Sequence, residues 1–208
     1  MERAKVLLVE DDLDWSSGLQ TYFASEPGFE IVACADSKEA CMSALDAIAV
    51  DVVLMDIMLG DAEATGLDAA LDIAHKHPGV KVIIVSSLDN DDEVFNEAFL
   101  NGAYDFVYKN EFEQIPATIA GAMNDQATKY GPRLKKLVYD KKKKLLNPYD
   151  IVLLKLTLEG RTQQEIADMN CVSLSAVKKH VGRILEKFDW SRSTKELADK
   201  CQKWGLLE

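Results

Sequence analysis

The sequence predicts an α/β fold, a doubly wound five-stranded parallel sheet, followed by a small all-α unit of four helices. Over the first 125 residues, five short aliphatic runs alternate with stretches of helical spacing, as in a parallel sheet covered on both faces. From Pro148 onward there is no strand signal. The charge also changes sign, because residues 1–128 hold 25 acidic and 6 basic residues whereas residues 129–208 hold 10 and 18.

The strands are predicted at residues 5–9, 30–33, 52–55, 82–85 and 105–108. Residues 6–9 and 82–85 are continuously apolar, as strands buried on both faces should be. Apolar residues recur at helical spacing between the strands, at Ala40, Cys41, Ala44, Leu45 and Ile48, at Leu67, Ala70, Leu71 and Ala74, and at Val94 and Ala98. Pro116 suits the first turn of a fifth helix.

Residues 127–146 interrupt this alternation. The Gly131-Pro132 pair and the run of four lysines at 141–144 indicate a linker or a loosely held helix. We therefore expect one domain at 1–126, a linker at 127–146 and a second domain at 147–208.

Capping patterns predict where the C-terminal helices begin. Thr162 with Glu165, and Ser193 with Glu196, form capping boxes that open the second and fourth helices. Asn170-Cys171 fits a tight turn, after which Ser173 caps the third helix. That third helix places Val177, Val181, Ile184, Leu185 and Phe188 on one face, and the fourth turns Leu197, Cys201 and Trp204 inward.

Composition excludes several classes of protein. With 48% hydrophobic residues the chain is too apolar for intrinsic disorder, yet its longest apolar runs of four or five residues are too short to span a membrane. The first residues hold no signal-peptide core, so a cytoplasmic protein is expected. The four cysteines form no C-x-x-C pair and are expected to be buried small hydrophobes.

Polar residues gather where the predicted strands end, which is the ligand-binding edge of an open parallel sheet. The first strand ends in Glu10-Asp11-Asp12, the third in Asp56, the fourth in Ser86-Ser87 and the fifth in Lys109. Carboxylates brought together repel one another unless a cation neutralises them, and oxygen ligands of this kind suit Mg²⁺. A carboxylate beside that ion can attack phosphorus to give an acyl phosphate, while Lys109 and Ser86 hold the transferred oxygens. Taken singly, Asp11 or Asp12 also fits a helix cap.

The strand-end residues resemble those of the CheY-like receiver domain of two-component response regulators. The similarity covers about residues 4–125, through VLLVEDD at 6–12, VLMD at 53–56, IVSS at 84–87 and GAYDFVYK at 102–109. It implies a flavodoxin-like sheet in the order 2-1-3-4-5.

By position, the resemblance makes Asp56 the phosphoacceptor. Glu10, Asp11 and the carbonyl of Met58 complete an Mg²⁺ site with Asp56. Ser86 and Phe106 form the switch pair, and Lys109 binds the phosphate. Two departures are the longer, proline-free loop at 59–66 and Asn110 at a position that is commonly a cis-proline.

The C-terminal part resembles the LuxR-type helix-turn-helix domain. The similarity spans about residues 146–204, through LEGRTQQEIA at 158–167, VS at 172–173 and VKKHVGRILEKF at 177–188. It implies that the third helix enters the DNA major groove and that the fourth often forms a dimer contact. By position Lys178, Lys179 and Gly182 face DNA and Arg183 lies near phosphate.

The chain is thus interpreted as a response regulator that a sensor histidine kinase phosphorylates and that binds double-stranded DNA as a homodimer. Two alternatives remain open. Asp12-x-Asp14-x-Ser16 resembles the first motif of haloacid-dehalogenase-type phosphatases, which would make the chain an enzyme. Alternatively, the basic C-terminal module binds protein rather than DNA.

Overall fold

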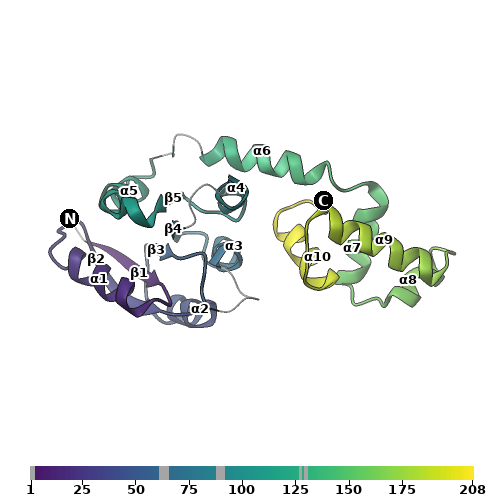
Figure 1. The fold of residues 1–208 in the computed structure, drawn as a ribbon, viewed down its shortest axis with the longest axis horizontal. Helices are drawn as coiled ribbons and strands as arrows, with labels where there is room; N and C mark the ends of the chain where they lie inside the picture. The colour runs from purple at the N-terminus through teal and green to yellow at the C-terminus, as the bar shows by residue number, and fades with distance from the viewer. Residues whose placement is uncertain (1–2, 61–65, 88–91, 127, 129–130) are drawn as a thin grey trace. The chain divides into compact units, whose positions relative to one another are not determined.

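The chain forms two compact units, Met1–Lys136 and Leu137–Glu208, in the computed structural model (Figure 1). The structure describes residues 3–208 apart from 61–65, 88–91, 127 and 129–130. An α/β unit comes first and an all-helical unit second, which confirms the predicted fold class. Most of the loop predicted to be lengthened after Asp56 lies outside the described residues.

The first unit contains one five-stranded parallel sheet in the order β2-β1-β3-β4-β5, which confirms the order implied by the receiver resemblance. Its strands are β1 (Ala4–Val9), β2 (Phe29–Ala35), β3 (Val52–Met55), β4 (Lys81–Ser86) and β5 (Asp105–Tyr108). The predicted runs locate all five strands. Two observed strands match the prediction at both ends, and the other three are one to three residues longer than predicted. Strand β3 is wholly buried, as expected of a central strand covered on both sides.

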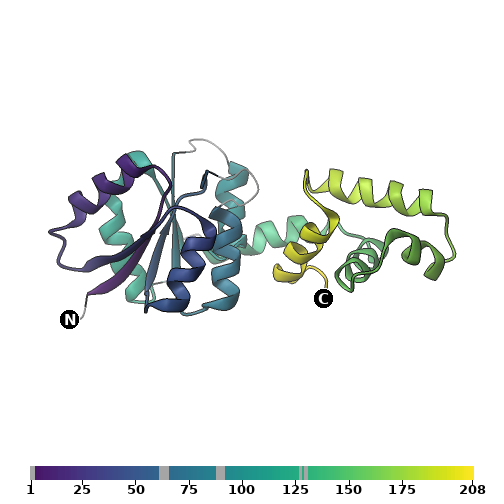
Figure 2. The same cartoon turned by 90° about the horizontal axis from the view of Figure 1, so that it is seen from below.

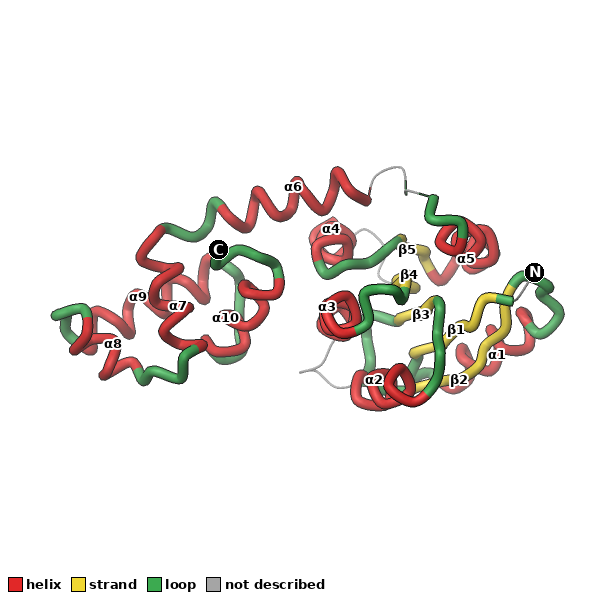
Figure 3. Tube along the Cα trace, turned by 180° about the vertical axis from the view of Figure 1, so that it is seen from behind, coloured by secondary structure: helices red, strands yellow, loops and turns green. Residues whose placement is uncertain are grey.

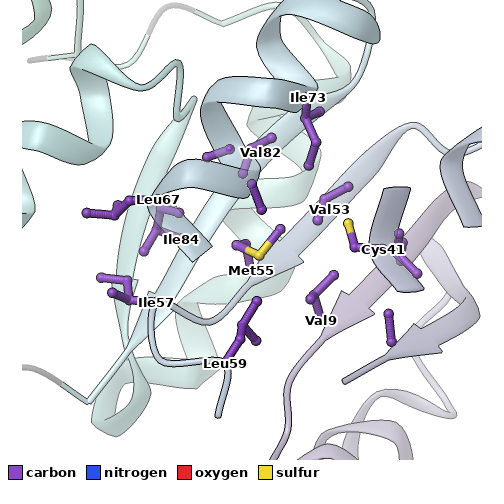
Figure 4. Packing of buried hydrophobic residues seen from close by; sticks show 14 of the residues in the cluster. Val9, Cys41, Val53, Met55, Ile57, Leu59, Leu67, Ile73, Val82 and Ile84 are labelled. Carbon is purple, nitrogen blue, oxygen red and sulfur yellow. The ribbon is translucent and has the colours of Figure 1, made fainter. Parts of the chain in front are cut away.

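Helices cover both faces of this sheet (Figure 2). They are α1 (Leu13–Phe23), α2 (Lys38–Ala47), α3 (Gly66–Lys76), α4 (Asp92–Leu100) and α5 (Ile115–Met123), with a short 3-10 helix, η1 (Lys109–Gln114), after β5. Side chains alternate along each strand, so Leu7 and Val9 pack beneath α2 and α3 while Val6 and Leu8 pack beneath α1 and α5. Figure 4 shows the first of these cores, with Met55 among the labelled strand residues.

The described residues of the second unit form helices joined by loops, without a strand, as the red and green tube of Figure 3 shows. Its last four helices are α7 (Pro148–Leu158), α8 (Gln163–Met169), α9 (Leu174–Lys187) and α10 (Thr194–Lys203). The capping boxes at Thr162 and Ser193 and the cap at Ser173 are present, as predicted. Cys171 has φ +53°, which produces the tight turn between α8 and α9.

Helix α6 (Gly131–Lys143) occupies most of the segment predicted as a linker or loosely held helix. The division between the two units falls inside it, after Lys136. Its second half is held in the second unit, where Val138 is buried and the Tyr139 hydroxyl donates to the Gly205 carbonyl at 3.3 Å. The domain boundaries at 126 and 147 stay predictions.

Two expectations about burial are wrong, and one stretch of helical spacing is longer than its helix. Helix α2 ends at Ala47, so Ile48 lies just past its end and is 40% exposed. Cys34 and Cys171 are exposed, because Cys34 lies on the edge strand β2 and Cys171 in the turn before α9; Cys41 and Cys201 are buried as expected.

Over the described part of the chain, no helix combines the length and apolarity that a membrane span requires.

Candidate phosphoacceptor site and candidate nucleic-acid interface

The carboxyl ends of the parallel strands bring the predicted acidic residues together. Val9 pairs with Met55, so the residues that follow them, Glu10 and Asp56, emerge side by side. The Asp56 amide donates to the Val9 carbonyl at 2.9 Å, and this bond extends the ladder to the start of the site. Backbone pairing, rather than side-chain contact, therefore sets the spacing of the two carboxylates.

Three carboxylates form the centre of this site. One oxygen each from Glu10, Asp11 and Asp56 lies within 4.8 Å of the other two. Glu10 and Asp56 are buried, whereas Asp11 is exposed. This set of hard oxygen donors, open to solvent on one side, fits a hydrated Mg²⁺ ion.

Lys109 bridges the two buried carboxylates. Its Nζ lies 2.6 Å from Glu10 Oε2 and 3.1 Å from Asp56 Oδ2. The other Asp56 oxygen, Oδ1, accepts the Ile57 amide at 2.7 Å. Both Asp56 oxygens are thus held in place.

The site carries more negative charge than Lys109 neutralises. The pKa of Glu10 is raised to about 7, mainly by burial and also by the neighbouring Asp56 charge, against the opposing effect of the Lys109 hydrogen bond. Burial would lower the pKa of Lys109, but its hydrogen bond with Glu10 and the charge of Asp56 raise it on balance. Lys109 therefore stays an ammonium, and a divalent cation would relieve the remaining repulsion.

Glycines shape the chain that follows Asp56. Gly60 has φ +59°, and a Cβ there would lie 3.2 Å from Asp11 Oδ2. Gly66 opens α3 with its amide donating to the Ile57 carbonyl at 2.8 Å. A Cβ on Gly66 would lie 1.8 Å from the Asp56 carbonyl oxygen, so only glycine fits. Met58 follows Asp56 with its side chain 60% exposed, and its carbonyl as an ion ligand stays a prediction.

The predicted switch residues belong to β4 and β5, the two strands that follow β3 in the sheet order. Ser86 ends β4 and is fully buried. Phe106 pairs with Ile84 in the sheet, and its ring lies 5.1 Å from the rings of both Phe95 and Tyr108.

Asp12 has a different role from its two acidic neighbours. It caps α1, with its Oδ1 accepting the amides of Asp14 at 2.9 Å and Trp15 at 3.1 Å. Asp12 and Asp14 are both exposed. This geometry disfavours the phosphatase alternative, because the proposed nucleophile is already bound to a helix N-terminus.

The residues expected at DNA, three cations and one glycine, are all exposed on α9. Lys178, Lys179, Gly182 and Arg183 lie opposite the buried stripe of Val177, Val181 and Ile184. A Cβ on Gly182 would meet nothing within 4 Å, so the fold itself does not require glycine there.

Sequence reasoning missed two residues that complete these sites. Asp150, fully buried at the start of α7, binds His180 Nε2 at 2.6 Å and Lys187 Nζ at 2.8 Å, and so ties α9 to α7. The signal that could have found it was the Asn147-x-x-Asp150 capping box. In the first unit, the Trp15 ring lies beside Lys109, with Nζ 5.4 Å from its centroid.

Fold and site together define a receiver domain. A family model described as the response regulator receiver domain matches residues 6–120, and the chain belongs to that family. Over 191 residues it is 25% identical to the response regulator protein VraR of Staphylococcus epidermidis, covering 89% of this chain and 90% of VraR.

Solved structures extend the likeness to the second unit. An RcsB response regulator in complex with DNA superposes with a TM-score of 0.57 at 16% identity, covering 99% of this chain and 98% of RcsB, and so shares the fold. A DNA-binding response regulator of the LuxR family from Staphylococcus aureus is 26% identical, with a TM-score of 0.52 over 57% of this chain and 98% of its own.

Proposed function

We propose that this protein is a DNA-binding transcription regulator of a two-component system, controlled by phosphorylation of Asp56. One observation carries the proposal: a buried Asp56 is held by Lys109 beside two further carboxylates, in a chain whose second unit exposes cations on a helix after a tight turn. The phosphoryl donor is a sensor histidine kinase. The protein acts in the cytoplasm, where it can reach both this kinase and DNA.

The residues have separate tasks in phosphoryl transfer. An Asp56 carboxylate oxygen attacks phosphorus, so an O–P bond forms as the bond from phosphorus to its donor breaks. Glu10, Asp11 and Asp56, with the Met58 carbonyl, would hold Mg²⁺, which supplies positive charge against the phosphoryl oxygens when bound. The Lys109 ammonium and the Ser86 hydroxyl stabilise oxygens of the transferred group.

Helix α9 is the element proposed to enter the DNA major groove. Lys178, Lys179 and Arg183 reach bases or phosphates, and Gly182 lets the backbone approach closely. The contact among Asp150, His180 and Lys187 fixes α9 on α7, so that these side chains are presented from a rigid support.

Alanine substitution of the α9 lysines tests the DNA interface. We expect each of Lys178→Ala and Lys179→Ala to weaken operator binding. If the lysine contacts a phosphate, the slope of the salt dependence should fall by about one. If it contacts a base, the binding free energy should weaken by about 1–3 kcal/mol and the sequence specificity should relax. The operator is first mapped by genome-wide binding of the wild type. Lys155→Ala, an exposed cation on α7, is the matched control. Wild-type affinity and slope in both α9 variants would favour the protein-binding alternative.

The receiver is expected to restrain DNA binding until it is phosphorylated. Phosphorylation adds negative charge, so charge repulsion cannot produce activation; Ser86 and Phe106 are proposed to move together and expose a surface for a homodimer. Two DNA-binding units then gain effective concentration at paired half-sites. The measurement compares operator affinity of the full chain with and without beryllofluoride, with mass from light scattering. Equal affinity and equal mass in the two states would contradict the restraint.

A further inference from the structure

An aromatic side chain lies against the lysine of the phosphoacceptor site. The Lys109 ammonium is enclosed by Glu10 at 2.6 Å, by Asp56 at 3.1 Å and by the Trp15 ring at 5.4 Å from Nζ to the centroid. Tryptophan is the aromatic side chain that attracts a cation most strongly across its ring face, and contacts within about 6 Å are effective. Trp15 is thus the one uncharged group in this set that attracts the ammonium.

Contacts on either side fix the Trp15 ring. The backbone amide of Trp15 donates to Asp12 at the cap of α1. The Trp15 ring meets Phe112 edge-on, with ring centroids 6.0 Å apart and an interplanar angle of 88°. Phe112 lies in η1, the same short helix that begins with Lys109. Tyr22, which is 47% exposed, also meets Phe112, with ring centroids 5.0 Å apart. The first turn of α1 is therefore packed against the segment that carries the lysine.

Burying the indole N–H of Trp15 has a free-energy cost that a hydrocarbon side chain would not have. Within the described part of the chain, Trp15 Nε1 is buried and has no hydrogen-bond partner. Burying an unpaired N–H is unfavourable, and phenylalanine or leucine would avoid it while filling less of the same space. The ring face beside Lys109 gives tryptophan a role that a smaller apolar side chain would fill less well.

We propose that Trp15 is a positioning residue for phosphoryl transfer, holding the Lys109 ammonium at the edge of Asp56 where the transferred oxygens arrive. This inference rests on the proposed function of Asp56. An ammonium has three N–H donors, and the indole face attracts its charge without competing as a lone-pair acceptor. As the O–P bond forms and the donor bond breaks, Lys109 can turn from the carboxylate oxygen to a phosphoryl oxygen while the ring keeps it in place.

Graded substitution of Trp15 in the full chain tests this inference. With Mg²⁺ and acetyl phosphate, we expect the rate of Asp56 phosphorylation to fall about threefold in Trp15→Phe and about tenfold in Trp15→Leu. The loss should appear in the rate constant at saturating donor, with the half-saturating donor concentration unchanged. The unfolding free energy of each variant is measured alongside, so that a loss of rate is separated from a loss of stability.

A second readout does not depend on phosphorylation. The ε-methylene protons of Lys109, lying over an aromatic face, should show an upfield ring-current shift in the NMR spectrum of the unphosphorylated chain. The shift should shrink in Trp15→Phe and vanish in Trp15→Leu, and the resonance is assigned by its loss in Lys109→Arg. Tyr22→Leu is the matched control, since Tyr22 packs on Phe112 from the same helix, and it should keep both the rate and the shift.

The outcomes separate the two claims. A wild-type chain that gains no phosphoryl group on Asp56 overturns the proposed function, and this inference with it. A wild-type chain that is phosphorylated, with Trp15→Leu equally fast and Lys109 unshifted, overturns the role of Trp15 alone. Equal slowing by Tyr22→Leu and Trp15→Leu would likewise show that aromatic packing, and not the ring beside the ammonium, sets the rate.

Discussion

Asp56→Asn is expected to abolish Mg²⁺-dependent phosphorylation of the full chain completely. The amide is not a nucleophile, and the substitution also removes one of the three carboxylates that would hold the ion. The measurement is intact mass after incubation with acetyl phosphate, where the wild type gains one hydroxylamine-labile phosphoryl group. A chelator should prevent the gain in the wild type.

Asp12→Asn is the matched control for this loss. Asparagine caps helices about as well as aspartate, so α1 should remain intact and labelling unchanged. The contrary pattern, with labelling kept in Asp56→Asn and lost in Asp12→Asn, would establish the phosphatase alternative and contradict the receiver mechanism.

Removal of Asp150 is expected to destabilise the second unit strongly. Asp150→Ala leaves His180 and Lys187 without their buried partner and breaks the capping box of α7. Loss of one partner of a buried ion pair costs about 3–5 kcal/mol, and we expect about 3 kcal/mol because Lys187 is partly exposed. DNA affinity should fall as well, since α9 loses its attachment to α7.

Urea unfolding followed by tryptophan fluorescence measures this effect. A Trp15→Phe background confines the signal to Trp190 and Trp204, both in the second unit. Asp199→Asn, which breaks the more exposed pair with Lys203, is the control and should cost less than about 1 kcal/mol. An Asp150→Ala chain as stable as this control would contradict the anchoring role.

The stability due to Asp150 should depend on pH in a defined direction. Burial would raise the pKa of its carboxyl, but the Asn147 amide and the Lys187 and His180 side chains outweigh burial and leave the pKa below the ordinary 3.8. A lowered folded pKa stabilises the fold above about pH 4, and that contribution is lost as the pH falls through the folded value. The difference in unfolding free energy between wild type and Asp150→Ala should therefore narrow in acid.

Local patterns were sufficient to predict most of this fold. Alternation of short apolar runs with helical spacing located the five strands, and the predicted capping residues Thr162, Ser173 and Ser193 each begin a helix. These signals depend on neighbours within a few residues. Because parallel strands end at one edge, the same reasoning places Asp56 and Lys109, 53 residues apart in the chain, at one site, and the two side chains are hydrogen-bonded there.

The sequence by itself therefore determined the two-unit architecture, the strand order through family resemblance, and the set of residues at the strand ends. Only the tertiary structure decided which side chains meet across elements: Trp15 against Lys109, and Asp150 against His180 and Lys187. It also decided that Cys34, Cys171 and Ile48 are exposed. The physical reason is that periodicity reports which face of an element is apolar, whereas a contact between elements depends on how those faces pack, and no spacing in the chain records that packing.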